Sequence, residues 1–157
     1  MKLAANMAHL PVVKLPAAAL RERSVEIDPK EIASSRVQTL IDDMTETMKI
    51  EKGVGIAASQ VGVNERLIVV DTPEGPQAFV NPVIVKSSKR KEDSHEGCLS
   101  IPGNFNTIKR HERIKLVAYD RKGREIQISA EGFPAIVFQH EVDHLDGTLF
   151  VDRIGRP

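Results

Sequence analysis

The sequence predicts a single α+β domain, in which antiparallel strands pack around a central helix. Three observations lead to this prediction. The chain has 157 residues, which is enough for one domain with a substantial core but few for two. Four short segments rich in Val and Ile predict strands, whereas two other segments have the features of helices. No internal repeat, low-complexity tract or linker divides the chain, so we expect residues 1–157 to form one domain.

The composition is that of an ordinary globular protein. Hydrophobic residues make up 41% and charged residues 28%, and the 22 basic and 22 acidic residues give a formal net charge of zero. Nucleic acids and anionic membranes attract basic proteins, so we expect neither as the main partner. No apolar run approaches the roughly 18 residues of a membrane span. The single cysteine cannot form an intrachain disulfide, and the proline-interrupted N-terminus does not resemble a secretory signal, so we expect a cytoplasmic protein.

The first helix is predicted to begin at Asp28-Pro29-Lys30-Glu31, after an extended or irregular segment. Asp28 is a suitable N-cap, Pro29 fits the first helical position, and Glu31 lies three residues after the cap. Gly53 and Gly55 end the helix. Between these signals, an apolar stripe at helical spacing is expected to face the core; it consists of Val37, Leu40, Ile41, Met44 and Met48.

Four strands are predicted, at residues 66–71, 79–86, 113–119 and 124–130. Pro82 lacks a backbone N–H, so the second of them should be an edge strand or a broken strand. A second helix should begin at Pro134 and end at Gly147, which suits the position just after a helix C-terminus.

The second helix carries the pattern His-Glu-Val-Asp-His at residues 140–144. Residues four apart lie on one face of a helix, so His140 and His144 can point at one metal ion. Glu141 is then placed to accept a proton from a metal-bound water. The pattern favours metal-assisted hydrolysis, but a four-coordinate site still needs a third protein ligand.

Cys98 is a candidate for that third ligand. It stands in Glu96-Gly97-Cys98-Leu99-Ser100, which we predict to be an irregular segment able to present a thiolate. A thiolate with two imidazoles leaves one coordination position open and suits iron or zinc better than magnesium or calcium. Two alternatives remain open at this point: a small buried hydrophobe, and a Cys–His nucleophile pair.

The segment from Gly53 to Gln60 reads Gly-Val-Gly-Ile-Ala-Ala-Ser-Gln. It is not a phosphate-binding loop, because Ala58 occupies the third glycine position and the segment follows a helix. The small residues allow another backbone or a ligand to approach closely. The Gln60 amide could stabilise a developing oxyanion. A tight turn between a helix and a strand is an equally good interpretation of this segment alone.

Together, three motifs resemble those of peptide deformylases: Gly-x-Gly-Ile-Ala-Ala-x-Gln, then Glu-Gly-Cys-Leu-Ser, then Gln-His-Glu-x-Asp-His-Leu-x-Gly. This resemblance covers most of the chain. It implies hydrolytic removal of the N-formyl group from the initiator methionine of new proteins, with release of formate. Cys98, His140 and His144 would be the metal ligands. The metal would be Fe²⁺, with Ni²⁺ or Co²⁺ as good substitutes and Zn²⁺ less active.

The resemblance also implies roles for other residues. Glu141 would act as general base and then as proton donor to the leaving amine, while Gln60 and the Leu99 N–H would hold the formyl oxygen. Glu96 and Asp143 are candidates for hydrogen bonds to the ligand histidines. The substrate-binding residues would be Val54, Gly55, Glu96, Gly97, Ile136, Val137 and His140.

The implied partners are N-formylmethionyl peptides and nascent chains near the ribosome, and we expect a monomer. Many bacterial members have an arginine at the position of Phe105, so the handling of short peptides with a free carboxylate could differ here.

Two other classes of function are consistent with part of this pattern. A zinc peptidase could use the same His-Glu-x-x-His pattern, but its third ligand usually follows the motif, where only Asp146 and Asp152 are available. A non-catalytic metal-binding protein would need a fourth protein ligand. The spare histidines are His9, His95 and His111, and His95 is the one nearest Cys98 in sequence.

Overall fold

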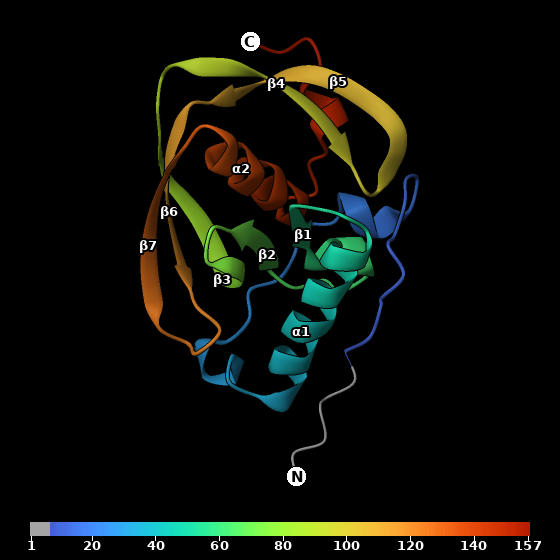
Figure 1. Ribbon diagram of the computed structural model, residues 1–157, viewed down its shortest axis with the longest axis vertical. Helices are drawn as coiled ribbons and strands as arrows, with labels where there is room; N and C mark the ends of the chain where they lie inside the picture. Colours follow the sequence, from blue (N-terminus) through green and yellow to red (C-terminus); the bar gives the residue numbers. More distant parts are fainter. Residues whose placement is uncertain (1–6) are drawn as a thin grey trace.

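Two antiparallel sheets and two α-helices make up the fold of residues 7–157, which are the residues that the computed structural model describes (Figure 1). The larger sheet has the strand order β1-β2-β3-β6-β7, and β4 and β5 form a separate hairpin. The predicted α+β class is confirmed. The elements are α1 Ser35–Ile50, β1 Gly55–Ala57, β2 Leu67–Thr72, β3 Gly75–Ser87, β4 Lys91–Cys98, β5 Ile101–His111, β6 Arg113–Tyr119, β7 Glu125–Glu131 and α2 Phe133–Leu145.

The sheet is covered by a helix on each face. Successive side chains of β2 point to opposite faces, and both sets are buried. Leu67 and Val69 belong to the core cluster that contains the buried residues of α1. Ile68 and Val70 belong to the cluster that contains the apolar residues of α2. The centre of the sheet is therefore apolar on both faces, which fixes the position of α2.

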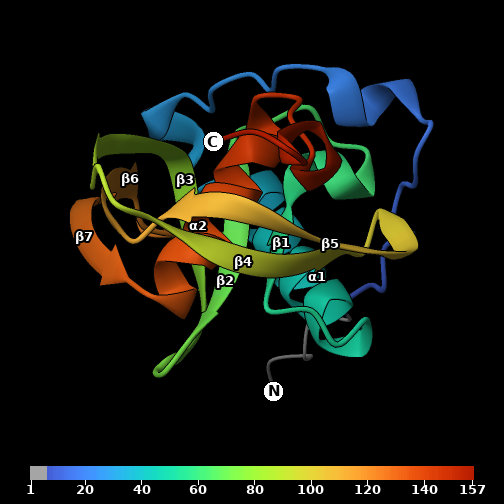
Figure 2. The ribbon, with the colours of Figure 1, turned by 90° about the horizontal axis from the view of Figure 1, so that it is seen from above.

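The β4–β5 hairpin lies on the side of α2 opposite the large sheet, as Figure 2 shows from above. A third apolar cluster lies beneath the hairpin and consists of Leu20, Ile101, Ile108, Leu149 and Phe150. Because α2 lies between the sheet and the hairpin, it is the central helix that the sequence predicted. One of its sides faces β1 and β2, and the other faces the strands that lead to Cys98.

The first helix begins later than predicted. Asp28 accepts a hydrogen bond from the backbone N–H of Lys30, but this cap starts only a 3₁₀ turn, Pro29–Glu31. The α-helix starts at Ser35, after Ser34, whose Oγ accepts a hydrogen bond from the N–H of Val37. The capping signal at Asp28 was correctly recognised but assigned to the wrong turn. The predicted stripe is buried in the core, apart from Leu40, which is partly buried against it.

All four predicted strands are present, and Pro82 breaks one of them. The structure places β2, β3, β6 and β7 within a few residues of the predicted limits. β3 pairs with β2 on one side and β6 on the other, so it is not an edge strand. Its register with β6 shifts between Val80 and Val83, which lie on either side of Pro82. The bulge accommodates the missing N–H of the proline.

Three strands were missed, and the prediction of an irregular segment around Cys98 was wrong. Cys98 is the last residue of β4, which pairs with β5 and has a register shift between Glu96 and Cys98. β4 reads Lys-Glu-Asp-Ser-His-Glu-Gly-Cys, so its buried positions carry Ser94 and Glu96 instead of apolar residues. A polar strand of this kind has none of the apolar alternation on which the prediction relied.

The first 28 residues were predicted to be extended or irregular. Residues 7–17 contain no helix or strand and run past the segments that form the site, but Ala18–Arg21 form a 3₁₀ helix, and residues 1–6 lie outside the described range. The Val13 N–H donates to the Gln60 carbonyl at 2.7 Å, and the Leu15 N–H donates to the Ser100 carbonyl at 3.0 Å. The N-terminal segment thus joins two loops that are 40 residues apart. None of the helices in the described part of the chain is long and apolar enough to cross a membrane.

Gly147 provides a test of how the N-terminal segment packs against the end of α2. Its φ is +73°, and an added Cβ would lie 2.5 Å from the Arg21 carbonyl oxygen, which is backbone and cannot easily move. We expect Gly147→Ala to lower the free energy of unfolding by about 2–4 kcal/mol, because steric overlap adds to the left-handed strain. Urea denaturation measures this change.

Gly155→Ala is the matched control. Gly155 has a similar φ, +76°, but nothing lies within 4 Å of an added Cβ, so the strain acts alone and should cost about 1 kcal/mol. Equal losses in the two variants would contradict the close approach of Arg21 to Gly147.

Candidate metal centre

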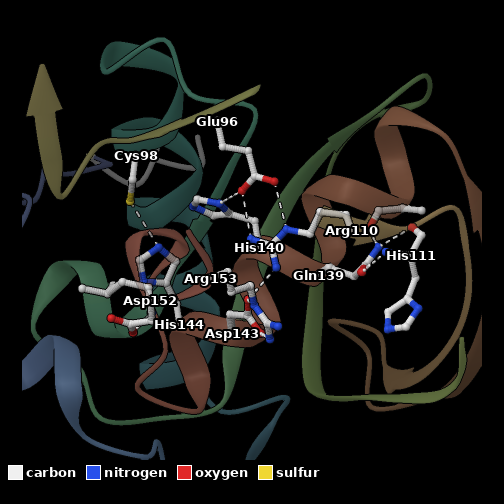
Figure 3. A network of polar contacts seen from close by, with 12 residues as sticks. Glu96, Cys98, Arg110, His111, Gln139, His140, Asp143, His144, Asp152 and Arg153 are labelled. Carbon is white, nitrogen blue, oxygen red and sulfur yellow. Dashed lines mark hydrogen bonds and ion pairs between the residues drawn. The ribbon is translucent and has the colours of Figure 1, made fainter. Parts of the chain in front are cut away.

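Cys98, His140 and His144 bring three metal-ligand atoms to within 4.8 Å of one another. The two histidines lie one turn apart on α2, and Cys98 reaches them from the end of β4 (Figure 3). The Cys98 Sγ lies 3.3 Å from the His144 Nε2. In a tetrahedral site with zinc-like bond lengths, a sulfur and a nitrogen ligand are about 3.6 Å apart. The cluster therefore fits one metal ion with a coordination position left over.

Glu96 fixes the orientation of the His140 ring. The His140 Nδ1 lies 2.8 Å from the Glu96 Oε1, which leaves Nε2 on the side of the cluster. Such a contact selects the tautomer whose Nε2 carries a free electron pair. Burial would lower the pKa of His140, but contacts with Cys98 and Glu96 raise it to about 10. The negatively charged groups around His140 thus favour a positive charge at its Nε2, which either a proton or a metal ion can supply.

His144 is held neutral. It is 1% exposed, and burial, together with the charges of His140 and Arg110, lowers its pKa well below the ordinary value. A neutral imidazole is the form that binds metals. Its Nδ1 is buried without a hydrogen-bond partner among the described residues.

Arg110, on β5, connects the hairpin to α2. Its Nε and Nη2 donate to the two oxygens of Glu96, each at 2.9 Å, and its Nη1 donates to Asp143. Asp143 also accepts two hydrogen bonds from Arg153 at 2.7 Å. Burial opposes ionisation of Glu96, but Arg110 and His140 lower its pKa to about 2. Glu96 thus contacts His140 as expected, whereas Asp143 contacts Arg110 and Arg153 instead of a histidine.

Glu141 is buried beside the cluster. It is 4% exposed, and its Oε2 has no hydrogen-bond partner in residues 7–157. Burial raises its pKa to about 7, although the charges of His140 and Arg110 oppose this effect. An added Cβ on Gly55 would lie 2.9 Å from the Glu141 Oε1, so a larger residue there would displace the Glu141 side chain. A carboxyl with this pKa can both accept and return a proton near neutral pH.

The Gln60 side chain is locked with its amide nitrogen toward the cluster. Its Oε1 accepts a hydrogen bond from the Ala57 N–H at 2.9 Å, so its Nε2 must point the other way. The Nε2 lies 3.2 Å from the Ser100 Oγ and 3.6 Å from the Cys98 Sγ. Gln60 therefore presents a donor beside Cys98, as a residue that stabilises negative charge requires.

A cavity of about 690 Å³ opens onto these residues. Gln60, Cys98, Leu99 and Glu141 line it together with all seven residues expected to bind substrate: Val54, Gly55, Glu96, Gly97, Ile136, Val137 and His140. The structure thus brings together every predicted site residue. His144 is not among the lining residues and lies behind them.

Sequence reasoning missed Arg153 and Phe133. Arg153 follows Asp143 by ten residues and lies outside every motif, so no local pattern pointed to its contact with that carboxylate. Phe133 lines the cavity mouth although it is 62% exposed. Its exposure could not be inferred from sequence, because an aromatic residue at a helix start normally suggests core.

The chain matches known proteins along nearly its whole length. The family model for polypeptide deformylase matches residues 9–157. A peptide deformylase of Symbiobacterium thermophilum is 47% identical over 150 residues, which cover 94% of this chain and 67% of the relative. Peptide deformylase 2 of Xanthomonas campestris is 44% identical over 151 residues, covering 94% of this chain and 88% of the relative.

Solved structures have the same fold. A peptide deformylase from Acinetobacter baumannii bound to Met-Ala-Ser superposes with a TM-score of 0.89 at 35% identity, covering 94% of this chain and 99% of that one. A peptide deformylase from Synechococcus elongatus in complex with actinonin gives a TM-score of 0.89 at 36% identity, covering 99% and 83%.

Arg110→Met tests the buried ion pairs. The substitution leaves Glu96 and Asp143 buried without their shared cation, so we expect the free energy of unfolding at pH 7 to fall by about 3–5 kcal/mol. The depressed pKa of Glu96 contributes stability that is fully present above its ordinary value of 4.5 and is lost as pH falls toward 2. In the variant this carboxyl can protonate more readily, so the difference in stability from wild type should narrow as the pH falls from 4.5 toward 2. Urea titrations at several pH values measure both effects.

Arg124→Met is the control, because Arg124 forms an exposed ion pair with Asp120 four residues away. It should change the stability by less than about 0.5 kcal/mol at any pH. Similar losses of stability in the two variants would mean that the buried ion pairs of Arg110 contribute no more to stability than an exposed ion pair does.

Proposed function

The chain belongs to the peptide deformylase family and removes the N-formyl group from new polypeptides, and we propose which of its residues carry out this reaction. The observation on which the proposal rests is the position of Glu141, a buried carboxyl with an unpaired oxygen beside a Cys/His/His cluster. This carboxyl has no hydrogen-bond partner in residues 7–157 that would explain its burial, whereas proton transfer does explain it. Neither alternative class of function is favoured by the family match.

Cys98, His140 and His144 are the proposed metal ligands. A divalent ion held there would polarise the formyl oxygen and make the attacking water more acidic. The residues fit this task, since the Cys98 Sγ and the His144 Nε2 are at ligand spacing and Glu96 keeps the His140 Nε2 free. The donor set of one sulfur and two nitrogens favours Fe²⁺ or Zn²⁺ over harder ions.

Glu141 is the proposed general base and acid. It takes a proton from the attacking water and passes it to the nitrogen of methionine, because an amine leaves poorly as an anion. Its pKa of about 7 suits both steps. Glu141 lines the same cavity as Cys98, and the absence of a side chain at Gly55 leaves room for its carboxylate there.

Gln60 and the backbone N–H of Leu99 are proposed to hold the formyl oxygen as it gains negative charge. The Gln60 Nε2 is already directed toward Cys98, so little reorganisation is needed. Fixed donors of this kind are typically worth about 3 kcal/mol in the transition state.

Substrate binding is proposed to combine strand pairing with an apolar pocket. Within residues 7–157, β1 pairs only with β2, so its other edge is available at Gly55 to hydrogen-bond the peptide backbone. The methionine side chain would enter the pocket formed by Val54, Glu96, Ile136, Val137 and His140. Close packing near Gly55 would exclude acyl groups larger than formyl by size.

Fe²⁺ is the proposed metal in the cell, with Ni²⁺ or Co²⁺ as working substitutes and Zn²⁺ as a less active one. We also propose that the enzyme acts as a monomer in the cytoplasm, close to the ribosome, where its nascent-chain substrates emerge. Sedimentation equilibrium and ribosome pelleting test the last two parts of this proposal.

Glu141→Gln should remove activity and keep the metal. An amide cannot accept the proton, so formate release from formyl-Met-Ala-Ser should fall by about 10³-fold. The metal content, measured by plasma mass spectrometry, should equal that of wild type. Glu125→Gln, an exposed change on β7, is the control and should leave both quantities unchanged.

Formate release by Glu141→Gln at more than a tenth of the wild-type rate would contradict the assigned role. No formate release from any iron- or nickel-loaded wild-type preparation would overturn the assignment altogether. Cleavage of internal peptide bonds instead would favour the zinc peptidase.

Chelation should abolish formate release, and anaerobic addition of Fe²⁺ or Ni²⁺ should restore it more fully than Zn²⁺. Cys98→Ser replaces the soft thiolate by a weakly acidic hydroxyl and should lower the metal affinity by at least about 100-fold. Ser129→Ala, an exposed change on β7 outside this cavity, is the control. Unchanged metal affinity in Cys98→Ser would exclude Cys98 as a ligand.

A further inference from the structure

Two phenylalanines lie exposed at the mouth of the cavity that contains Glu141. Phe105, on β5, is 65% exposed, and Phe133, at the start of α2, is 62% exposed. Both line the cavity. Exposed aromatic rings beside a polar site offer apolar surface to a ligand that enters the cavity.

The ring of Phe105 is held in place although it faces solvent. It lies against Gly97, where an added Cβ would be 2.5 Å from the Phe105 Cε1. It also stacks on the ring of His95, with centroids 6.3 Å apart and an interplanar angle of 19°. Contacts with Gly97 and His95 thus restrict the orientation of the Phe105 ring. The side chain therefore loses little conformational entropy when a ligand binds to its exposed face.

The position of this ring relates it to the residues downstream of methionine. Gly97 immediately precedes Cys98, and it lines the same cavity as Gly55 of β1. A peptide whose formyl group lies at Cys98 and whose methionine enters the pocket near Val137 must leave through the mouth. Phe105 and Phe133 border that exit.

We propose that Phe105 is a specificity-determining residue that binds an apolar side chain at the second or third position of the new polypeptide. This inference rests on the proposed function, because it assumes that the chain enters formyl group first. The contact replaces water on an aromatic face, and contacts of this size change kcat/KM by about three- to tenfold.

The test compares two series of peptide amides, formyl-Met-X-Ala and formyl-Met-Ala-X, with X as Phe, Leu, Ser or Asp. In wild type, kcat/KM for X = Phe should exceed that for X = Ser by about three- to tenfold in at least one series, through KM. In Phe105→Ala this ratio should fall below twofold. Phe105→Leu should retain most of the preference, because an aliphatic side chain still offers apolar surface.

Val85→Ala is the matched control. Val85 is an exposed apolar residue, 54% exposed, on β3, and it does not line the cavity. It should leave the Phe-to-Ser ratio at the wild-type value. Thermal melting should show that every variant remains folded, since each change is on the surface.

Two results would overturn the proposal: a wild-type ratio below twofold in both series, or an unchanged ratio in Phe105→Ala. A loss of equal size for X = Phe and X = Ser would also overturn it, because the ring would then act only on the shape of the hairpin. Failure of the proposed function looks different, since no peptide would release formate whatever its X residue.

Discussion

The ion pairs of Arg110 are the contacts on which the geometry of the site depends. Arg110 lies on the hairpin and donates two hydrogen bonds to Glu96. It donates a third hydrogen bond to Asp143 on α2. Glu96 in turn orients His140. One buried guanidinium therefore sets both the distance between hairpin and helix and the direction of a ligand ring. An apolar cluster of the same volume would stabilise the fold about as well as these buried ion pairs, although breaking them is costly. The value of this network therefore lies in precise positioning.

The site also depends on strong burial of polar groups in an otherwise apolar interior. α2 places Glu141 and His144 between a sheet that is apolar on both faces and the hairpin that covers them. The same burial keeps His144 neutral and gives Glu141 a pKa near neutrality. The position of α2 between the sheet and the hairpin therefore accounts both for the apolar packing of the sheet and for the shifted pKa values of Glu141 and His144.

The Cys/His/His cluster and the neighbouring Glu141 were predictable from sequence. The contacts that support these residues were predictable only in part. His140, Glu141 and His144 follow a helical spacing that defines their geometry locally, and Cys98 stands within a motif of its own. The strand that carries Cys98 was missed because its buried positions hold Ser94 and Glu96, whose burial is stabilised by partners distant in sequence. Arg153 was missed for the same reason. The delayed start of α1 shows that two competing caps, Asp28 and Ser34, cannot be ranked without tertiary packing.

The N-terminal segment has a consequence for how the enzyme itself is made. Val13 and Leu15 are bonded to the loops of Gln60 and Ser100, and the site is completed by His144 and by Arg153. Native contacts of such long range make folding slow, because distant segments must meet before any contact is gained. During synthesis, the apolar faces of the early strands remain exposed to solvent until α2 has been made. An enzyme that acts on emerging polypeptides therefore completes its own active site only after α2 has been made.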